Sequence, residues 1–263
     1  MIYTHVHSRA DFLPGQFQIG STAPNVTPDP NRIANAVKDW RECMRFDALY
    51  NEFIWRSDGT HEGSNRTEAI VPGTKPEHPF YVEPGDVRYI GASYRLNPDY
   101  PWRQNKTIMQ IGMLPNPTAG SFYCGLLFFG QQNELMCSGG SRIWKPPLTE
   151  WFRPVAKVRF QPPDDPNDAS ALRIGRGSIE IIVGGQAVLS GTGRATMGTA
   201  GAYGKVGSYG TPIPNTVSRL YIADLIVADT YAEAAMLDPP PLATDSIESV
   251  TVAMKSGRQI KLP

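Results

Sequence analysis

The chain has 263 residues, of which 41% are hydrophobic, and it carries 25 Lys and Arg residues against 25 Asp and Glu residues. This length and composition suffice for a sizeable core and suit a single large β-sandwich domain. The net charge of zero gives no reason to expect a nucleic-acid or membrane-surface partner. No apolar run approaches the roughly 18 residues that cross a bilayer.

The N-terminus, MIYTHVHSRADFLPGQ, lacks the basic start and apolar run of a secretory signal. We therefore expect a cytoplasmic protein, or one released by cell lysis such as a virion protein. Three cysteines, Cys43, Cys124 and Cys137, show no metal-type spacing. We expect free or buried thiols, with a Cys124–Cys137 bridge as the alternative, and no cofactor.

Residues 1–30 have no clear periodicity, whereas apolar residues recur at helical spacing from Pro30 to Phe46. This pattern predicts an N-terminal helical segment over 30–46. From Leu49 to Asp229, short apolar or alternating runs follow one another between Gly and Pro turn signals, and Gly184-Gly185 has the form of a two-residue hairpin turn. The series predicts an all-β antiparallel sandwich or jelly roll.

The composition changes after Asp229. TYAEAAML, residues 230–237, predicts a short helix, and DPPP, residues 238–241, predicts a stiff linker. The last residues predict a strand pair that turns at Ser256-Gly257. We therefore divide the chain into a main domain, 1–237, and a Pro-rich linker with a C-terminal β arm, 238–263. This arm forms a final hairpin or docks on a second copy or a virion neighbour.

Three stretches carry polar residues within strands: NRTEAI with Arg66 and Glu68, MQIG with Gln110, and a run containing the four in-phase residues Tyr203, Lys205, Gly207 and Tyr209. Residues two apart on a strand share a face. In this order, the stretches resemble the Arg-x-Glu, Gln-Ile/Val-His and Tyr-x-Lys-x-Gly-x-Tyr strands of polysaccharide lyases. That group includes alginate, glucuronan and heparin-lyase-like enzymes, and the resemblance covers roughly residues 50–230.

The resemblance implies a concanavalin-like β-jelly roll that binds an acidic polysaccharide and cleaves it by β-elimination. It implies that Arg66 and Gln110 bind the uronate carboxylate and that Tyr203 or Tyr209 transfers the proton. Lys205 adds positive charge to the groove. We also place Glu68 and Arg95 in the substrate-binding set.

The chain departs from this pattern at Gly112, where the family has its histidine. Two interpretations follow. Either His61, His78 or a tyrosine alone serves as the base, since a nearby cation lets tyrosine act as base and acid, or the fold persists without activity. A non-enzymatic phage virion, decoration or adhesion protein is therefore the alternative function. A glucanase with paired carboxylates ranks last, because no Glu-x-Asp-x-x-Glu strand is present.

Other features have plainer explanations. Trp102, Trp144 and Trp151 could stack on sugars, but we expect at least two of them to pack in the core or in loops. Asp164, Asp165 and Asp168 lack EF-hand spacing, so we favour a solvated loop over a calcium site. The glycine-rich segment 191–204 has no phosphate-loop signature, and we expect a flexible loop over a groove.

Overall fold

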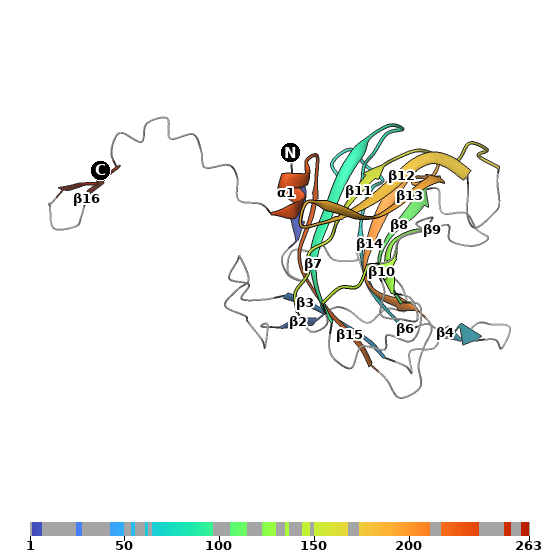
Figure 1. Ribbon diagram of the computed structural model, residues 1–263, viewed down its shortest axis with the longest axis horizontal. Coiled ribbons are helices and arrows are strands. Elements are labelled where there is room, and N and C mark those ends of the chain that lie inside the picture. Colours follow the sequence, from blue (N-terminus) through green and yellow to red (C-terminus); the bar gives the residue numbers. More distant parts are fainter. Residues whose placement is uncertain are drawn as a thin grey trace.

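Two antiparallel β-sheets make up most of the described structure (Figure 1). The computed structural model describes the backbone of residues 2–6, 25–27, 43–49, 54–55, 61–62, 65–96, 106–114, 123–129, 135–136, 144–147, 150–167, 174–210, 217–236, 250–253 and 259–262. It describes the side chains of residues 71–96, 107–114, 135, 144–147, 150–167, 174–208 and 220–236. The expected all-β sandwich is confirmed, since the strand pairs within both sheets are antiparallel.

The larger sheet has eight strands. Their order is β13 (Gln186–Arg194), β12 (Ile174–Val183), β11 (Val155–Arg159), β7 (Val87–Leu96), β15 (Val217–Ala228), β3 (Cys43–Leu49) and β2 (Asn25–Thr27), with β1 (Ile2–Val6) also paired to β15. The predicted hairpin at Gly184-Gly185 is confirmed. Both glycines have positive φ, 57° and 81°, as a turn between two twisted strands requires.

The smaller sheet has five strands and carries the Gln110 and Lys205 strands. Its order is β10 (Leu135–Met136), β9 (Tyr123–Phe129), β8 (Lys106–Leu114), β14 (Gly201–Gly210) and β6 (Asn65–Val71). Two further strand pairs are β4 (Ile54–Trp55) with β5 (His61–Glu62) and β16 (Val250–Ala253) with β17 (Gln259–Leu262). The last pair is the strand pair expected around Ser256-Gly257.

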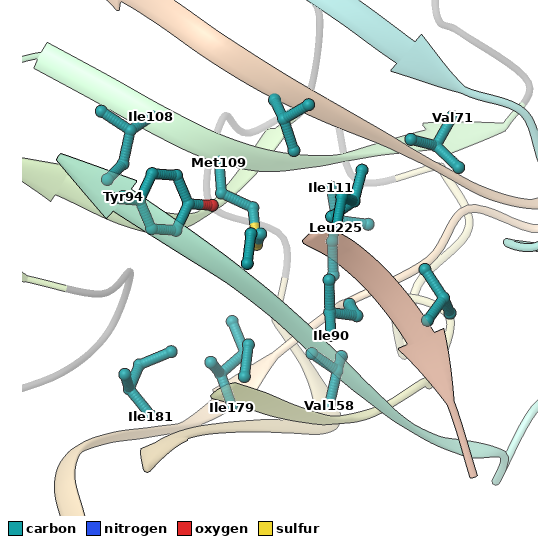
Figure 2. Close-up of a cluster of buried hydrophobic side chains, with 14 of the residues drawn as sticks. Val71, Ile90, Tyr94, Ile108, Met109, Ile111, Val158, Ile179, Ile181 and Leu225 are labelled. Carbon is teal, nitrogen blue, oxygen red and sulfur yellow. The ribbon is translucent and has the colours of Figure 1, made fainter. Parts of the chain in front are cut away.

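The main core lies between the two sheets (Figure 2). The smaller sheet contributes Val71, Ile108, Met109 and Ile111, and the larger sheet contributes Ile90, Tyr94, Val158, Ile179, Ile181 and Leu225. A second, small cluster lies on the outer face of the larger sheet, where the predicted short helix α1 (Tyr231–Ala235) packs on Val155 and Ile226. Helix α1 begins with Thr230 as its N-cap, whose side chain accepts a hydrogen bond from the Glu233 N–H.

Three sequence expectations are wrong in part. Residues 43–46, the end of the expected helix, belong to strand β3, which pairs with β15, while residues 30–42 lie outside the described residues. Residues 2–6 and 25–27, taken as irregular, are strands. Segment 191–204 is mostly strand β13 and strand β14. The short connection between them is anchored, because the Thr196 N–H donates to the Gln161 carbonyl at 2.9 Å.

Candidate functional site

Strands β8 and β14 bring the sequence-predicted polar residues together. They pair in antiparallel register, with Gln110 opposite Lys205 and Gly112 opposite Tyr203. Residues directly opposite each other in an antiparallel pair lie on the same face of the sheet. The positions between them are core residues: Met109, Ile111, Ala202 and Val206. Gln110, Gly112, Tyr203 and Lys205 therefore form one set, here called the polar face, on the side of the smaller sheet away from the core.

The two central side chains of the polar face are shielded from solvent. Lys205 is 1% exposed and Gln110 is 3% exposed, whereas Tyr203 is partly exposed. A lysine is almost never fully buried unless its charge is compensated. A strand glutamine with an ordinary surface role would be in contact with water. This degree of burial was not predicted from the sequence. It distinguishes Gln110 and Lys205 from the polar side chains of the sheets that are exposed to solvent.

Gln110 is a buried polar residue in a largely apolar strand. Its Oε1 is buried and has no hydrogen-bond partner within the described part of the chain. An amide oxygen held in this way costs about 1–3 kcal/mol of stability. Rotation of the amide by half a turn presents Nε2 as a donor in the same place. The side chain can thus offer an acceptor to a hydroxyl or a donor to a carboxylate.

Tyr203 lies across strand β8 at Gly112. A Cβ atom on residue 112 would lie 2.1 Å from Cζ of Tyr203 and 2.6 Å from its hydroxyl oxygen. The phenol therefore takes the space that a side chain at residue 112 would need. The Lys205 Nζ lies 5.5 Å from the centre of the same ring, within the range of a cation–π contact.

Strand β6 extends this register on the other side of β14. Arg66 lies opposite Tyr209, and Glu68 lies opposite Gly207. The backbone therefore places both residues of the Arg-x-Glu stretch beside strand β14, which carries Tyr203 and Lys205, as the motif order implies. The side chains of Arg66, Glu68 and Tyr209 lie outside the described residues.

Arg95 does not join this set. It belongs to β7 in the larger sheet, where it lies opposite Tyr221 of β15 and is largely buried. Its neighbours along the strand, Tyr94 and Leu96, face the core, so Arg95 lies on the outer side of that sheet.

Tyr94 itself is a core residue, and burial raises its pKa far above the usual range, so its phenol stays neutral.

Of the two histidine candidates, only His78 has a described side chain, and its ring makes its hydrogen bonds within its own turn. The His78 Nδ1 accepts hydrogen bonds from the backbone N–H groups of Thr74 at 3.0 Å and Lys75 at 3.1 Å. In the described part of the chain, the hydrogen bonds of the His78 ring all join it to residues 74 and 75. We conclude that His78 holds its own turn together. The side chain of His61, on β5, lies outside the described residues.

Two of the remaining candidates, Trp144 and Asp164, make contacts within the protein. Trp144 packs against the core, with its ring 5.8 Å from that of Phe152. Asp164 pairs with Arg176 at 3.7 Å. The side chains of Trp102, Asp168 and the three cysteines lie outside the described residues. Among the described residues, no three His, Cys, Asp or Glu side chains gather to hold a metal ion, and no described helix has the length and apolar character needed to cross a membrane.

The polar face combines three chemical groups in two cross-strand pairs that follow one another on the same face of the sheet. An ammonium group and an amide lie opposite each other, and a phenol lies one pair further along. Ammonium and amide groups bind and neutralise a carboxylate, and a phenol donates or accepts a proton. The arrangement therefore suits a ligand that carries a carboxylate next to an acidic C–H or a hydroxyl.

Comparison with known proteins supports the fold. No known family model matches the sequence, and no curated protein matches it. Among solved structures, the endo-β-1,4-glucuronan lyase of the fungus Trichoderma reesei aligns with a TM-score of 0.55 and 14% identity, over 89% of this chain and 98% of that one. The alginate lyase vAL-1 from Chlorella virus aligns with a TM-score of 0.45 and 10% identity, over 79% and 89% of the two chains. The structure of HCR/D-Sa-GBL1/C aligns with a TM-score of 0.41 and 12% identity, over 79% of this chain and 42% of that one. The chain thus has the β-sandwich fold of a glucuronan lyase.

Proposed function

We propose that this protein binds a uronate-containing polysaccharide through the polar face and cleaves it by β-elimination. The observation that carries the proposal is the buried cross-strand pair of Gln110 and Lys205 on the outer face of the smaller sheet. A carboxylate bound there would gain a charge-assisted contact from Lys205 and a hydrogen bond from Gln110. The glucuronan-lyase fold, with Arg66 in register with Tyr209, adds support.

The chemistry follows from the carboxylate. Neutralising its charge stabilises the negative charge that develops when the neighbouring C5 proton is removed. Lys205 is shielded from water, and a charge–charge attraction is several times stronger in such a place than in solvent. Because both side chains are almost fully buried, a sugar can reach Lys205 and Gln110 only after the atoms that shield them move aside. We therefore expect binding to be slower than diffusion allows.

Burial also favours one alternative, a non-enzymatic virion or adhesion protein. In such a protein, the polar face would stay permanently covered and would serve only to hold the smaller sheet together. We further propose that the three cysteines are free thiols. We propose that the C-terminal arm, residues 238–263, docks on a neighbouring copy or on a virion subunit, and that the protein is cytoplasmic or released by cell lysis.

The proposed function is tested with a panel of polymers. Glucuronan, alginate, a heparin-type chain and uronate-rich capsular polysaccharides are incubated with the protein, and the ultraviolet absorbance of the unsaturated uronate is followed. Binding is measured in parallel by calorimetry, with dextran as the neutral control. We expect at least one acidic polymer to bind and to give rising absorbance, while dextran does neither. If no acidic polymer binds, the virion or adhesion function replaces this proposal.

A further inference from the structure

Tyr203 is the member of the polar face that meets solvent. Lys205 is 1% exposed and Gln110 is 3% exposed, and Gly112 is buried although it has no side chain of its own, whereas Tyr203 is partly exposed. The Lys205 Nζ lies 5.5 Å from the centre of the Tyr203 ring. The ring therefore contributes to the cover that a sugar has to pass before it reaches Lys205 and Gln110.

The absence of a side chain at Gly112 is what allows the ring to lie in this place. Gly112 and Tyr203 are direct cross-strand partners, and a Cβ on residue 112 would lie 2.1 Å from Cζ and 2.3 Å from Cε1 of the ring. The atoms in conflict are the far end of a side chain, so the ring and not the backbone would give way. The lyase strands that this stretch resembles have a histidine here, and a histidine would leave no room for the ring.

The ring can move while the sheet around it stays intact. Strand β14 is an internal strand, hydrogen-bonded to β8 on one side and to β6 on the other. The neighbouring positions Ala202 and Val206 are anchored in the core. The Tyr203 ring is attached at a partly exposed position, and it changes its place by rotation about two side-chain bonds. Such a rotation breaks no hydrogen bond between the strands.

The two contacts that hold the ring closed are modest. An aromatic ring over a cross-strand glycine, and a cation beside an aromatic ring, each stabilise one conformation only weakly. A conformation a few kcal/mol higher in free energy is populated at roughly 0.1–10%. A ligand that requires such a minor conformation binds with an affinity reduced by that fraction, and its association slows.

We propose that the Tyr203 ring is a gate, which closes over Gly112 and limits the access of an acidic sugar to Gln110 and Lys205. In the closed position, the ring shields the ammonium and covers the bare backbone of β8. When the ring turns away, a carboxylate reaches the amide and the ammonium. The gate requires the ring and the glycine, and it does not require the hydroxyl. The identity of the ligand rests on the proposed function, whereas the closed ring is a property of the free protein.

The same contact has a purely structural explanation. An aromatic ring over a cross-strand glycine covers exposed backbone and stabilises the sheet, with no effect on access to its neighbours. In that case, displacing or removing the ring would change the stability of the protein and leave the accessibility of Lys205 unchanged. The accessibility of the Lys205 amine therefore distinguishes the gate from a structural contact.

The first experiment measures this accessibility without any ligand. The full-length protein is treated briefly with acetic anhydride, and acetylation of Lys205 is followed by mass spectrometry, relative to the exposed Lys75. We expect Lys205 to react at least about tenfold faster in Tyr203→Ala and in Gly112→Ala than in the wild type. Tyr203→Phe keeps the ring and should stay within about twofold of the wild type. Equal rates in the wild type, Tyr203→Ala and Gly112→Ala would overturn the gate.

A control separates the gate from a general loss of stability. Leu189 is 1% exposed in the core, on β13 of the larger sheet, so Leu189→Ala destabilises the fold without touching the polar face. Its Lys205 should react within about twofold of the wild-type rate. If Leu189→Ala exposes Lys205 as much as Gly112→Ala does, unfolding and not the ring controls access, and the proposal is wrong.

The second experiment measures the arrival of a ligand. Oligoglucuronate is mixed with the wild type, Tyr203→Ala and Tyr203→Phe in a stopped-flow instrument, and intrinsic fluorescence reports binding. We expect the association rate constant to rise by about tenfold or more in Tyr203→Ala and to stay within about twofold in Tyr203→Phe. An association rate constant in Tyr203→Ala that is no higher than that of the wild type would overturn the gate.

The two experiments also separate this inference from the proposed function. If neither the wild type nor Tyr203→Ala binds any acidic polymer, the proposed function fails, and the acetylation rates alone decide whether the ring shields Lys205. If a polymer binds but neither rate depends on the ring, the proposed function stands and the gate is overturned. Faster acetylation together with faster association supports both.

Discussion

Replacing Arg153 with alanine is expected to lower the free energy of unfolding by about 3–5 kcal/mol, the range measured when one partner is removed from a buried charged pair. Arg153 joins three elements on the outer face of the larger sheet. Its Nη1 donates to the Ser93 Oγ on β7 and to the Asp224 carbonyl on β15, both at 3.0 Å. Its Nε and Nη2 both donate to the Ala234 carbonyl in α1, at 3.0 and 2.6 Å.

The cost is large because each partner of Arg153 would be left buried. Asp224 is 3% exposed and has a left-handed backbone, φ 48°, at an irregularity of β15 between Ala223 and Ile226. Burial lowers the pKa of Arg153 to about 10, with the charge of Asp224 acting in the opposite direction. The guanidinium therefore keeps its charge at neutral pH. Without it, the Asp224 carboxylate loses the favourable charge of Arg153, and the Ala234 carbonyl loses two hydrogen bonds.

The measurement is urea denaturation of the wild type, Arg153→Ala and the control Arg159→Ala. Arg159 is an exposed residue of the neighbouring strand β11, so its substitution should change the unfolding free energy by no more than about 0.5 kcal/mol. Equal, small effects of the two substitutions would contradict the central role given to Arg153 in joining α1 to the larger sheet.

Replacing Gln110 with methionine is expected to stabilise the protein and to weaken its ligand binding. The buried Gln110 Oε1 without a partner costs about 1–3 kcal/mol, and a methionine of similar size removes that cost. The thermal midpoint should therefore rise. The same substitution removes the amide hydrogen bond that the proposed function assigns to the uronate carboxylate. Such a bond is worth roughly 1.5–3 kcal/mol, so the Kd should rise by about tenfold or more.

Opposite signs of the two effects distinguish a functional site from a structural one, because residues kept for binding are commonly a burden on stability. The matched control is Gln186→Met, at an exposed glutamine on β13, which should alter neither quantity. A Gln110→Met protein that is less stable than the wild type would show that the amide supports the fold. In that case, the polar face would have no need of a ligand.

Local sequence patterns predicted the elements whose signal lies within their own residues. The alternating run of β7, the Gly184-Gly185 turn and the short helix α1 are such elements. Strand β3 was missed at residues 43–46, because its pairing with β15 outweighs the helical spacing of its apolar residues. A three-residue strand such as β2 carries too little periodicity to be recognised without its partner.

The candidate site was predictable only strand by strand. Spacing placed Tyr203 in phase with Lys205, and Gln110 in phase with Gly112, but only the structure sets the two strands side by side in register. The burial of Lys205 and the position of the phenol over Gly112 depend on that register. The Arg153 interactions were not foreseen, since its hydrogen-bond partners are 60 to 81 residues away along the chain.

Recognition of a carboxylated sugar by the polar face can be tested by a single titration. Oligoglucuronate and its methyl ester, in which every carboxylate is neutralised, are titrated by calorimetry into the wild-type protein and into Gln110→Met. We expect the wild type to bind the acid and to bind the ester little or not at all. We also expect the affinity for the acid to be at least about tenfold weaker in Gln110→Met. Equal affinity for acid and ester, or an affinity that Gln110→Met leaves unchanged, would contradict it.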